Sequence, residues 1–148
     1  DTLQFDTDNI IKKAVEDNRA ALAEPTTENI EAAGIDISKV DYMIPAVPYL
    51  VKDGKIIVDA IAQGFREDKI VINRAQRSAL GITKDNKLIL VTGANLNITE
   101  LAQVMMSLGC NKAMNLDGGA SSGLYAKGRM ITKPGRKLNT VLMVFDAK

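Results

Sequence analysis

The sequence contains no histidine and a single cysteine among its 148 residues. Without histidine, neither a Ser-His-Asp or Cys-His nucleophile nor a histidine-ligated zinc site can form. Proton transfer would have to come from Asp, Glu, Lys or Tyr side chains. A lone cysteine allows no internal disulfide and says little about the compartment. Because Cys110 follows the helix-ending Gly109, we expect it to be a small buried hydrophobic residue.

Long apolar runs, repeats and low-complexity segments are also missing. No stretch is long enough to cross a bilayer as a helix. No signal peptide is recognised at the start, which leaves secretion open because a mature or excised chain would lack one. The formal net charge is +1 with both signs interspersed, so no basic stripe favours nucleic acid. Since 46% of the residues are hydrophobic, the chain can bury a sizeable core as one domain or part of one.

Residues 1–44 predict a helical amino-terminal segment or insertion. Asp8 can cap a helix over about 9–23, whose apolar residues recur along one side. Thr27 begins a shorter helix that Gly34 ends. Nothing in this segment suggests catalysis, and its acids are expected to form a solvated face, with partner binding as the alternative.

From residue 45 to residue 148 the pattern turns to strands. Asp53-Gly54 between two short apolar runs is a strong hairpin signal. Asn97 and Glu100 form a capping-box-like start to a helix whose methionines we expect in the core. We therefore expect an α+β fold with a mixed or antiparallel sheet, one packed helix after the second hairpin, and the helical amino-terminal segment. The predicted strands span residues 49–51, 55–58, 78–82, 87–92, 112–116, 122–126, 129–132 and 138–145.

Residues 115–122 contain the largest concentration of candidate functional groups in the chain. Asp117 follows an apolar strand and precedes Gly118 and Gly119, whose missing side chains let backbone N–H groups approach a ligand. The two serines that follow supply hydroxyls that donate or accept hydrogen bonds. This combination suits a sugar or phosphate oxygen, and Asp117 becomes the leading acid or base. An Asp-Gly turn in a hairpin is the equally weighted alternative.

Arg77 begins a strand on which Ala79 and Gly81 share its face, so that this face is nearly bare beside the guanidinium. A flat, bare surface next to an arginine suits an oxyanion such as phosphate. The alternative is an ion pair with an acid of the same sheet.

Four motifs occur together in this order. They are Leu-Val-Lys-Asp-Gly-Lys at 50–55, Arg-Ser-Ala-Leu-Gly-Ile at 77–82, Asn-Leu-Asp-Gly-Gly-Ala-Ser-Ser at 115–122, and Asn139 before a final apolar strand. In this combination they resemble the phosphodiester glycosidase domain family, over roughly residues 45–146.

Two departures from that family pattern stand out. Ala120 occupies the place of the family's third glycine, which adds a methyl group to the turn. The motif of the family's first half, of the Gly-Gly-Phe-Phe type, is not visible. Residues 45–148 therefore resemble the C-terminal part of the domain, or a shortened form of it.

The resemblance implies a hydrolase that releases a sugar, with N-acetylglucosamine as the type sugar, from a sugar-1-phosphodiester on a glycan or cell-wall polymer. Asp117 would be the nucleophile or base, and Arg77 would stabilise the phosphate. A phosphate monoester has a second pKa of about 6, so its departure needs charge stabilisation more than a proton. Asp59 and Glu67 are candidates for any second acid. The implied substrate-binding residues are Asn115, Gly118, Gly119, Ser121, Ser122 and Asn139.

No cofactor is implied, although Asp117 with Asn115 and a serine could hold Ca²⁺ or Mg²⁺. The expected partner is a carbohydrate or sugar phosphate, at an extracellular or cell-surface location, without nucleic acid or a membrane span. A missing domain half or a larger assembly is also expected. Two other classes stay open: a non-catalytic carbohydrate-binding domain, favoured by Ala120 and the absent first half, and a structural module of a surface or virion assembly.

Overall fold

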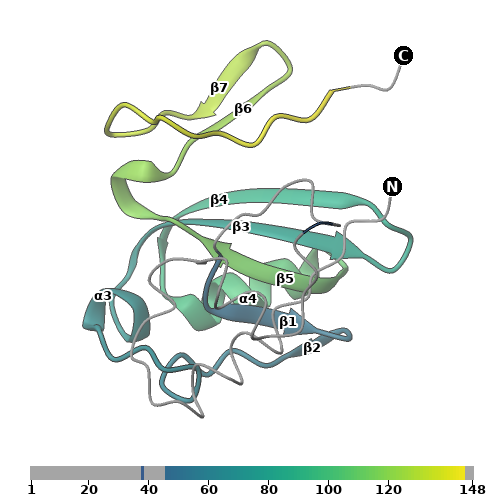
Figure 1. Ribbon diagram of the computed structural model, residues 1–148, viewed down its shortest axis with the longest axis vertical. Coiled ribbons are helices and arrows are strands. Elements are labelled where there is room, and N and C mark those ends of the chain that lie inside the picture. The colour runs from purple at the N-terminus through teal and green to yellow at the C-terminus, as the bar shows by residue number, and fades with distance from the viewer. Residues whose placement is uncertain (1–37, 39–45, 146–148) are drawn as a thin grey trace.

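The computed structural model describes residue 38 and residues 46–145, and its centre is a five-stranded antiparallel sheet (Figure 1). The strand order is β2-β1-β5-β3-β4, and helix α4 packs against one face. A separate two-stranded sheet, β6–β7, lies beyond β4 (Figure 1). The elements are β1 (Tyr49–Lys52), β2 (Lys55–Ile56), α3 (Asp68–Val71), β3 (Ala75–Thr83), β4 (Leu88–Leu96), α4 (Ile98–Ser107), β5 (Cys110–Leu116), the 3₁₀ turn η2 (Gly119–Ser121), β6 (Leu124–Ala126) and β7 (Arg129–Thr132).

This architecture confirms the expected α+β fold with an antiparallel sheet and one packed helix. The helices expected over about 9–23 and from Thr27 lie outside the described residues. Helix α3 was not expected from the sequence. In the part of the chain that the structure describes, no helix is long and apolar enough to span a membrane.

Turn residues fix the hairpins, and strand order then positions the chain after β5. Asp53 and Gly54 both have positive φ, 50° and 69°, the backbone conformation that the tight turn between β1 and β2 requires. Strand β5 inserts between β1 and β3, with Leu116 opposite Ser78. The residues that follow β5 therefore emerge beside the beginning of β3.

Helix α4 begins at a complete capping box, as the sequence predicts. Asn97 Oδ1 accepts the Glu100 N–H at 2.8 Å, and Glu100 Oε2 accepts the Asn97 N–H at 3.0 Å. Leu101 and Met105 are fully buried, which confirms a methionine in the core, whereas Leu108 lies past the helix end and is half exposed. The cap thus sets where the helix starts to cover the sheet.

The face that carries Arg77, Ala79 and Gly81 is not an open surface, so the expectation of a bare face was wrong. Ala79 is buried in the core formed with α4. A Cβ built on Gly81 would lie 2.7 Å from both Cys110 Sγ and Met105 Cε. The small residues make room for the helix rather than for an oxyanion. Cys110 is buried, as predicted, and its burial raises the pKa of the thiol.

Gly81→Ala will destabilise the fold by about 1–3 kcal/mol, the cost typical of overpacking a core. The new methyl group would meet two core side chains at 2.7 Å and the backbone oxygen of Lys112 at 3.0 Å. The urea denaturation midpoint measures the loss. Gly123→Ala is the control, because its Cβ would meet Pro134 no closer than 3.4 Å. Equal midpoints for the two variants would contradict the packing described.

Residues 138–145 do not form the predicted closing strand, which corrects the sequence-based expectation. The last strand of the described chain is β7, and the side chains of residues 141–145 are 47–78% exposed. Figure 1 shows this stretch as an extended trace outside the larger sheet. A continuous apolar run favours a strand that is covered on both faces. Among the described residues, no strand pairs with this stretch, so its backbone takes part in no sheet hydrogen bonding there.

Candidate functional site

Asp117 lies directly after β5, beside the start of β3. A Cβ built on Gly118 would sit 2.8 Å from the carbonyl oxygen of Gln76 and 3.8 Å from the Cα of Arg77. The close approach of β3 therefore requires a glycine at position 118, for a reason independent of any ligand. Gly119 has φ +59°, and nothing lies within 4 Å of a Cβ built there. The turn is thus closed on the β3 side and open beside Gly119.

The carboxylate of Asp117 faces solvent and is held from two sides. Its Oδ1 accepts the Gly118 N–H at 2.9 Å, and its Oδ2 lies 3.2 Å from Arg136 Nη2. Arg136 Nε also donates to Ser121 Oγ at 2.8 Å. The side chains of Asp117 and Arg136 are 75% and 60% exposed. Arg136 therefore links the candidate acid to a candidate substrate-binding hydroxyl at the surface.

Arg136 was missed by the sequence analysis, because no short-range spacing connects it to Asp117. The backbone around it is docked on the η2 turn: the Gly135 N–H donates to the Ala120 carbonyl at 2.9 Å. A Cβ built on Gly135 would lie 3.3 Å from the Ala120 Cβ, so the methyl group that replaces the family's third glycine faces a glycine. The turn signal of Pro134-Gly135 after β7 is the one sequence feature that indicates a reversal here.

Lys69 is a second cation of this region that sequence reasoning missed. Its Nζ lies 2.6 Å from Glu67 Oε2. The hydrogen bond and the charge of Glu67 raise the pKa of Lys69, and the charge of Asp117 adds a smaller increase. Glu67, a candidate second acid, thus forms an ion pair with the lysine whose pKa the charge of Asp117 also raises. Lys69 lies in helix α3, and Glu67 is the residue just before its first turn.

The guanidinium of Arg77 is turned into the protein. The residue is only 5% exposed, and its Nη2 donates to the carbonyl oxygens of Asn73 at 2.7 Å and Lys69 at 2.8 Å, while Nε donates to that of Leu96 at 3.2 Å. Burial lowers the pKa of Arg77, but an arginine side chain stays charged. Within the described residues, the guanidinium thus binds backbone carbonyls through Nε and Nη2 and forms no hydrogen bond through Nη1.

Two of the implied substrate-binding residues, Asn115 and Ser122, are buried and so are not part of the exposed surface cluster. Asn115 is buried, with Nδ2 donating to the Val47 carbonyl at 2.6 Å, and its Oδ1 is the one buried side-chain polar atom of the described residues without a partner. Ser122 is 1% exposed and its Oγ accepts from Ser78 Oγ at 2.9 Å. Asn139 is exposed in a bend past Arg136. The surface cluster consists of Asp117, Gly119, Ser121, Arg136 and Lys69.

A metal at this place finds little support in the donor set. Among the described residues, no group of three His, Cys, Asp or Glu side chains could hold a metal ion. Arg136 already supplies positive charge beside Asp117. Asn115 Oδ1, another member of the expected oxygen set, is a buried atom, whereas the carboxylate of Asp117 is 75% exposed.

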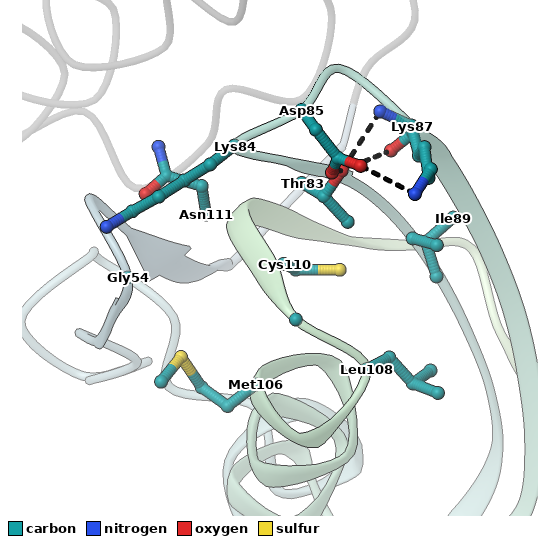
Figure 2. Close-up of a pocket in the computed structure, with 11 residues that line it drawn as sticks. Gly54, Thr83, Lys84, Asp85, Lys87, Ile89, Met106, Leu108, Cys110 and Asn111 are labelled. Carbon is teal, nitrogen blue, oxygen red and sulfur yellow. Dashed lines mark hydrogen bonds and ion pairs between the residues drawn. The ribbon is translucent and has the colours of Figure 1, made fainter.

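A hollow of about 490 Å³ lies at the opposite end of β3 and β5 (Figure 2). Its rim carries Asp85, which bonds to both Thr83 and Lys87 (Figure 2); these bonds lower the pKa of Asp85 to about 2. Its wall includes Ile89 and Cys110. None of the sequence-predicted site residues lines this hollow, so it is distinct from the Asp117 cluster.

Comparison with known proteins gives this geometry a context. The family model of phosphodiester glycosidases matches residues 4–145. A hypothetical protein from Synechocystis shares 32% identity with a TM-score of 0.54, over 60% of this chain and 18% of that chain. The catalytic domain of zebrafish N-acetylglucosamine-1-phosphodiester alpha-N-acetylglucosaminidase, auto-inhibited by its pro-peptide, shares 21% identity with a TM-score of 0.47, over 60% of this chain and 34% of that chain. The chain thus spans a minor part of these solved structures. No curated protein matches it.

Proposed function

The chain belongs to the phosphodiester glycosidase family, and from that premise we propose that it releases a sugar from a sugar-1-phosphodiester on a glycan or cell-wall polymer. The observation that carries the proposal is the exposed carboxylate of Asp117, which pairs with Arg136 beside Ser121. Residues 45–148 would be the C-terminal part of the domain, and residues 1–44 a helical amino-terminal segment or insertion, most of which the family match also includes. A cell-wall substrate would place the protein outside the cell or at its surface.

The proposed chemistry divides between the acid and the cations. Asp117 attacks the anomeric carbon or takes a proton from the attacking water, and the sugar–phosphate C–O bond breaks. If Asp117 attacks, water then hydrolyses the glycosyl ester on Asp117, which frees the sugar and restores the carboxylate. The leaving group departs as a phosphate monoester anion, which needs positive charge more than a proton, since its second pKa is about 6. Arg136, which contacts Asp117, lies where it can supply that charge. Ser121 would hold a hydroxyl of the sugar.

A non-catalytic carbohydrate-binding module is the second candidate function. It is favoured by the ion pair of Asp117 with Arg136, which engages the carboxylate of the candidate acid. The hollow at the opposite end of the sheet offers such a module a separate place for a ligand. A structural role in a surface assembly stays a further alternative.

The full chain should release N-acetylglucosamine from a methyl phosphodiester of N-acetylglucosamine-1-phosphate, and leave methyl N-acetylglucosaminide intact. The phosphate is a good leaving group, whereas the methoxide of the glycoside needs a second acid. Liberated sugar, measured by chromatography, reports both reactions. Equal hydrolysis of the two compounds would contradict the proposed role of phosphate. Binding without hydrolysis would select the carbohydrate-binding module.

A further inference from the structure

The cation that touches Asp117 carries an inference about how the site chooses its substrate. We infer that Arg136 is the phosphate-binding residue of the site, and that it exchanges Asp117 for a phosphate oxygen when the substrate binds. This inference rests on the proposed function and assigns its specificity to one side chain. Without a phosphate, Arg136 holds the carboxylate; with one, it releases the carboxylate for reaction.

The two contacts of Arg136 differ in length. Its Nε lies 2.8 Å from Ser121 Oγ, whereas its Nη2 lies 3.2 Å from Asp117 Oδ2. Charge-assisted N–H···O⁻ bonds are about 2.7–2.9 Å long when well formed. The pair with Asp117 is therefore loose, and both side chains are mostly exposed, where water weakens ion pairs. The Asp117 contact is the one that an incoming anion can replace.

The backbone that carries Arg136 is anchored, so the exchange needs only a side-chain rotation. Gly135 N–H donates to the Ala120 carbonyl at 2.9 Å. Pro134 lies 3.4–3.5 Å from a Cβ position on Gly123. The guanidinium thus starts from a fixed point above the η2 turn. Ser121 at the same turn can keep the Nε bond while the other edge changes its partner.

Competing cations are committed to other groups. Arg74 Nη1 lies 2.6 Å from Glu100 Oε1, and Lys69 Nζ lies 2.6 Å from Glu67 Oε2. Arg77 holds three backbone carbonyls. Among the described residues, Arg136 is the arginine whose anionic partner is the candidate nucleophile itself. Its planar fork also matches two oxygens of a phosphodiester.

The exchange would make the site selective for an anionic substrate. A neutral glycoside brings no charge that could replace the carboxylate at Arg136, so it lacks this contribution to binding. A phosphodiester supplies its own negative charge at the position where the leaving group needs stabilisation. One side chain would thereby couple recognition of the phosphate to exposure of the nucleophile.

The test measures binding of inorganic phosphate to the full chain by isothermal titration calorimetry, which does not depend on turnover. Arg136→Gln should weaken phosphate binding at least about tenfold, because it removes a charge-assisted pair of hydrogen bonds. Arg136→Lys should keep part of the affinity. Arg129→Gln, an exposed arginine at the start of β7, is the control and should bind as wild type does. Circular dichroism checks that each variant is folded.

A double-variant comparison separates partner exchange from a general charge effect. Asp117→Asn should bind phosphate several-fold more tightly than wild type, because Arg136 no longer has to leave a carboxylate. In the Arg136→Gln background the same change should bring a much smaller gain. An equal gain in both backgrounds, undiminished binding by Arg136→Gln, or no phosphate binding by wild type would overturn the inference. Phosphate binding that follows these expectations without any hydrolysis would instead contradict the proposed function alone.

Discussion

Asp117→Asn will lower the rate of sugar release from a phosphodiester by about 10²- to 10⁴-fold, the range that a positioned acid or base contributes. The amide keeps the shape of the side chain but can neither attack the anomeric carbon nor take a proton from water. The free energy of unfolding should change little, because Asp117 is 75% exposed and its ion pair lies at the surface. Initial rates and urea midpoints, measured on the same preparation, test both statements.

Asp53→Asn is the matched control for that variant. Asp53 is exposed in the β1–β2 turn with φ 50°, a conformation that asparagine adopts readily. The turn lies at the other end of β5, where Gly54 N–H donates to the Asn111 carbonyl. This variant should retain the wild-type rate. Similar rates for the two variants would assign the chemistry to another residue.

Arg77→Met will lower the free energy of unfolding by about 2–4 kcal/mol, because it removes three hydrogen bonds from a charged donor to backbone carbonyls. Methionine fills much of the same space but donates nothing. The carbonyl oxygens of Lys69, Asn73 and Leu96 would lose the donor that they share. Urea denaturation followed by circular dichroism measures the loss.

Arg66→Met provides the reference for this variant, because Arg66 is exposed and has no hydrogen bond or ion pair within the described part of the chain. It should unfold near the wild-type midpoint. If Arg77→Met also did so, and yet failed to bind phosphate, the guanidinium would serve the ligand rather than the backbone. A large loss of stability would instead identify Arg77 as a residue that positions the segments around the site.

Elements with local causes could be predicted from the sequence. Asp53-Gly54 specifies a turn with positive φ, and Asn97 with Glu100 specifies a helix start; both were found. Residues 138–145 depend on a neighbouring strand that no local pattern can supply, so this prediction was wrong. Helix α3 spans only four residues, too few for a helical period to be recognised.

The candidate site was predictable only where its residues are close in sequence. Asp117, Gly119 and Ser121 come from one turn, and the structure keeps them together. Arg136 lies on a loop whose backbone is hydrogen-bonded to the η2 turn, and no sequence spacing connects this loop to the turn. For Arg77, the alternation of side chains along a strand correctly predicted that Ala79 and Gly81 share its face. It did not predict that helix α4 packs against that face. The alternation of side chains along a strand predicts which face a residue lies on, but it does not predict which element packs against that face.

The hydrogen bonds from buried Arg77 to backbone carbonyls help to position a charged residue at the surface. Lys69 presents its ammonium group near Asp117, while its own backbone oxygen is held from inside by Arg77. A substitution of buried Arg77 can therefore shift a surface cation near the proposed nucleophile without altering any exposed side chain. The 134–136 loop is attached independently, so evolution could retune the recognition of anions there while the buried framework is inherited unchanged.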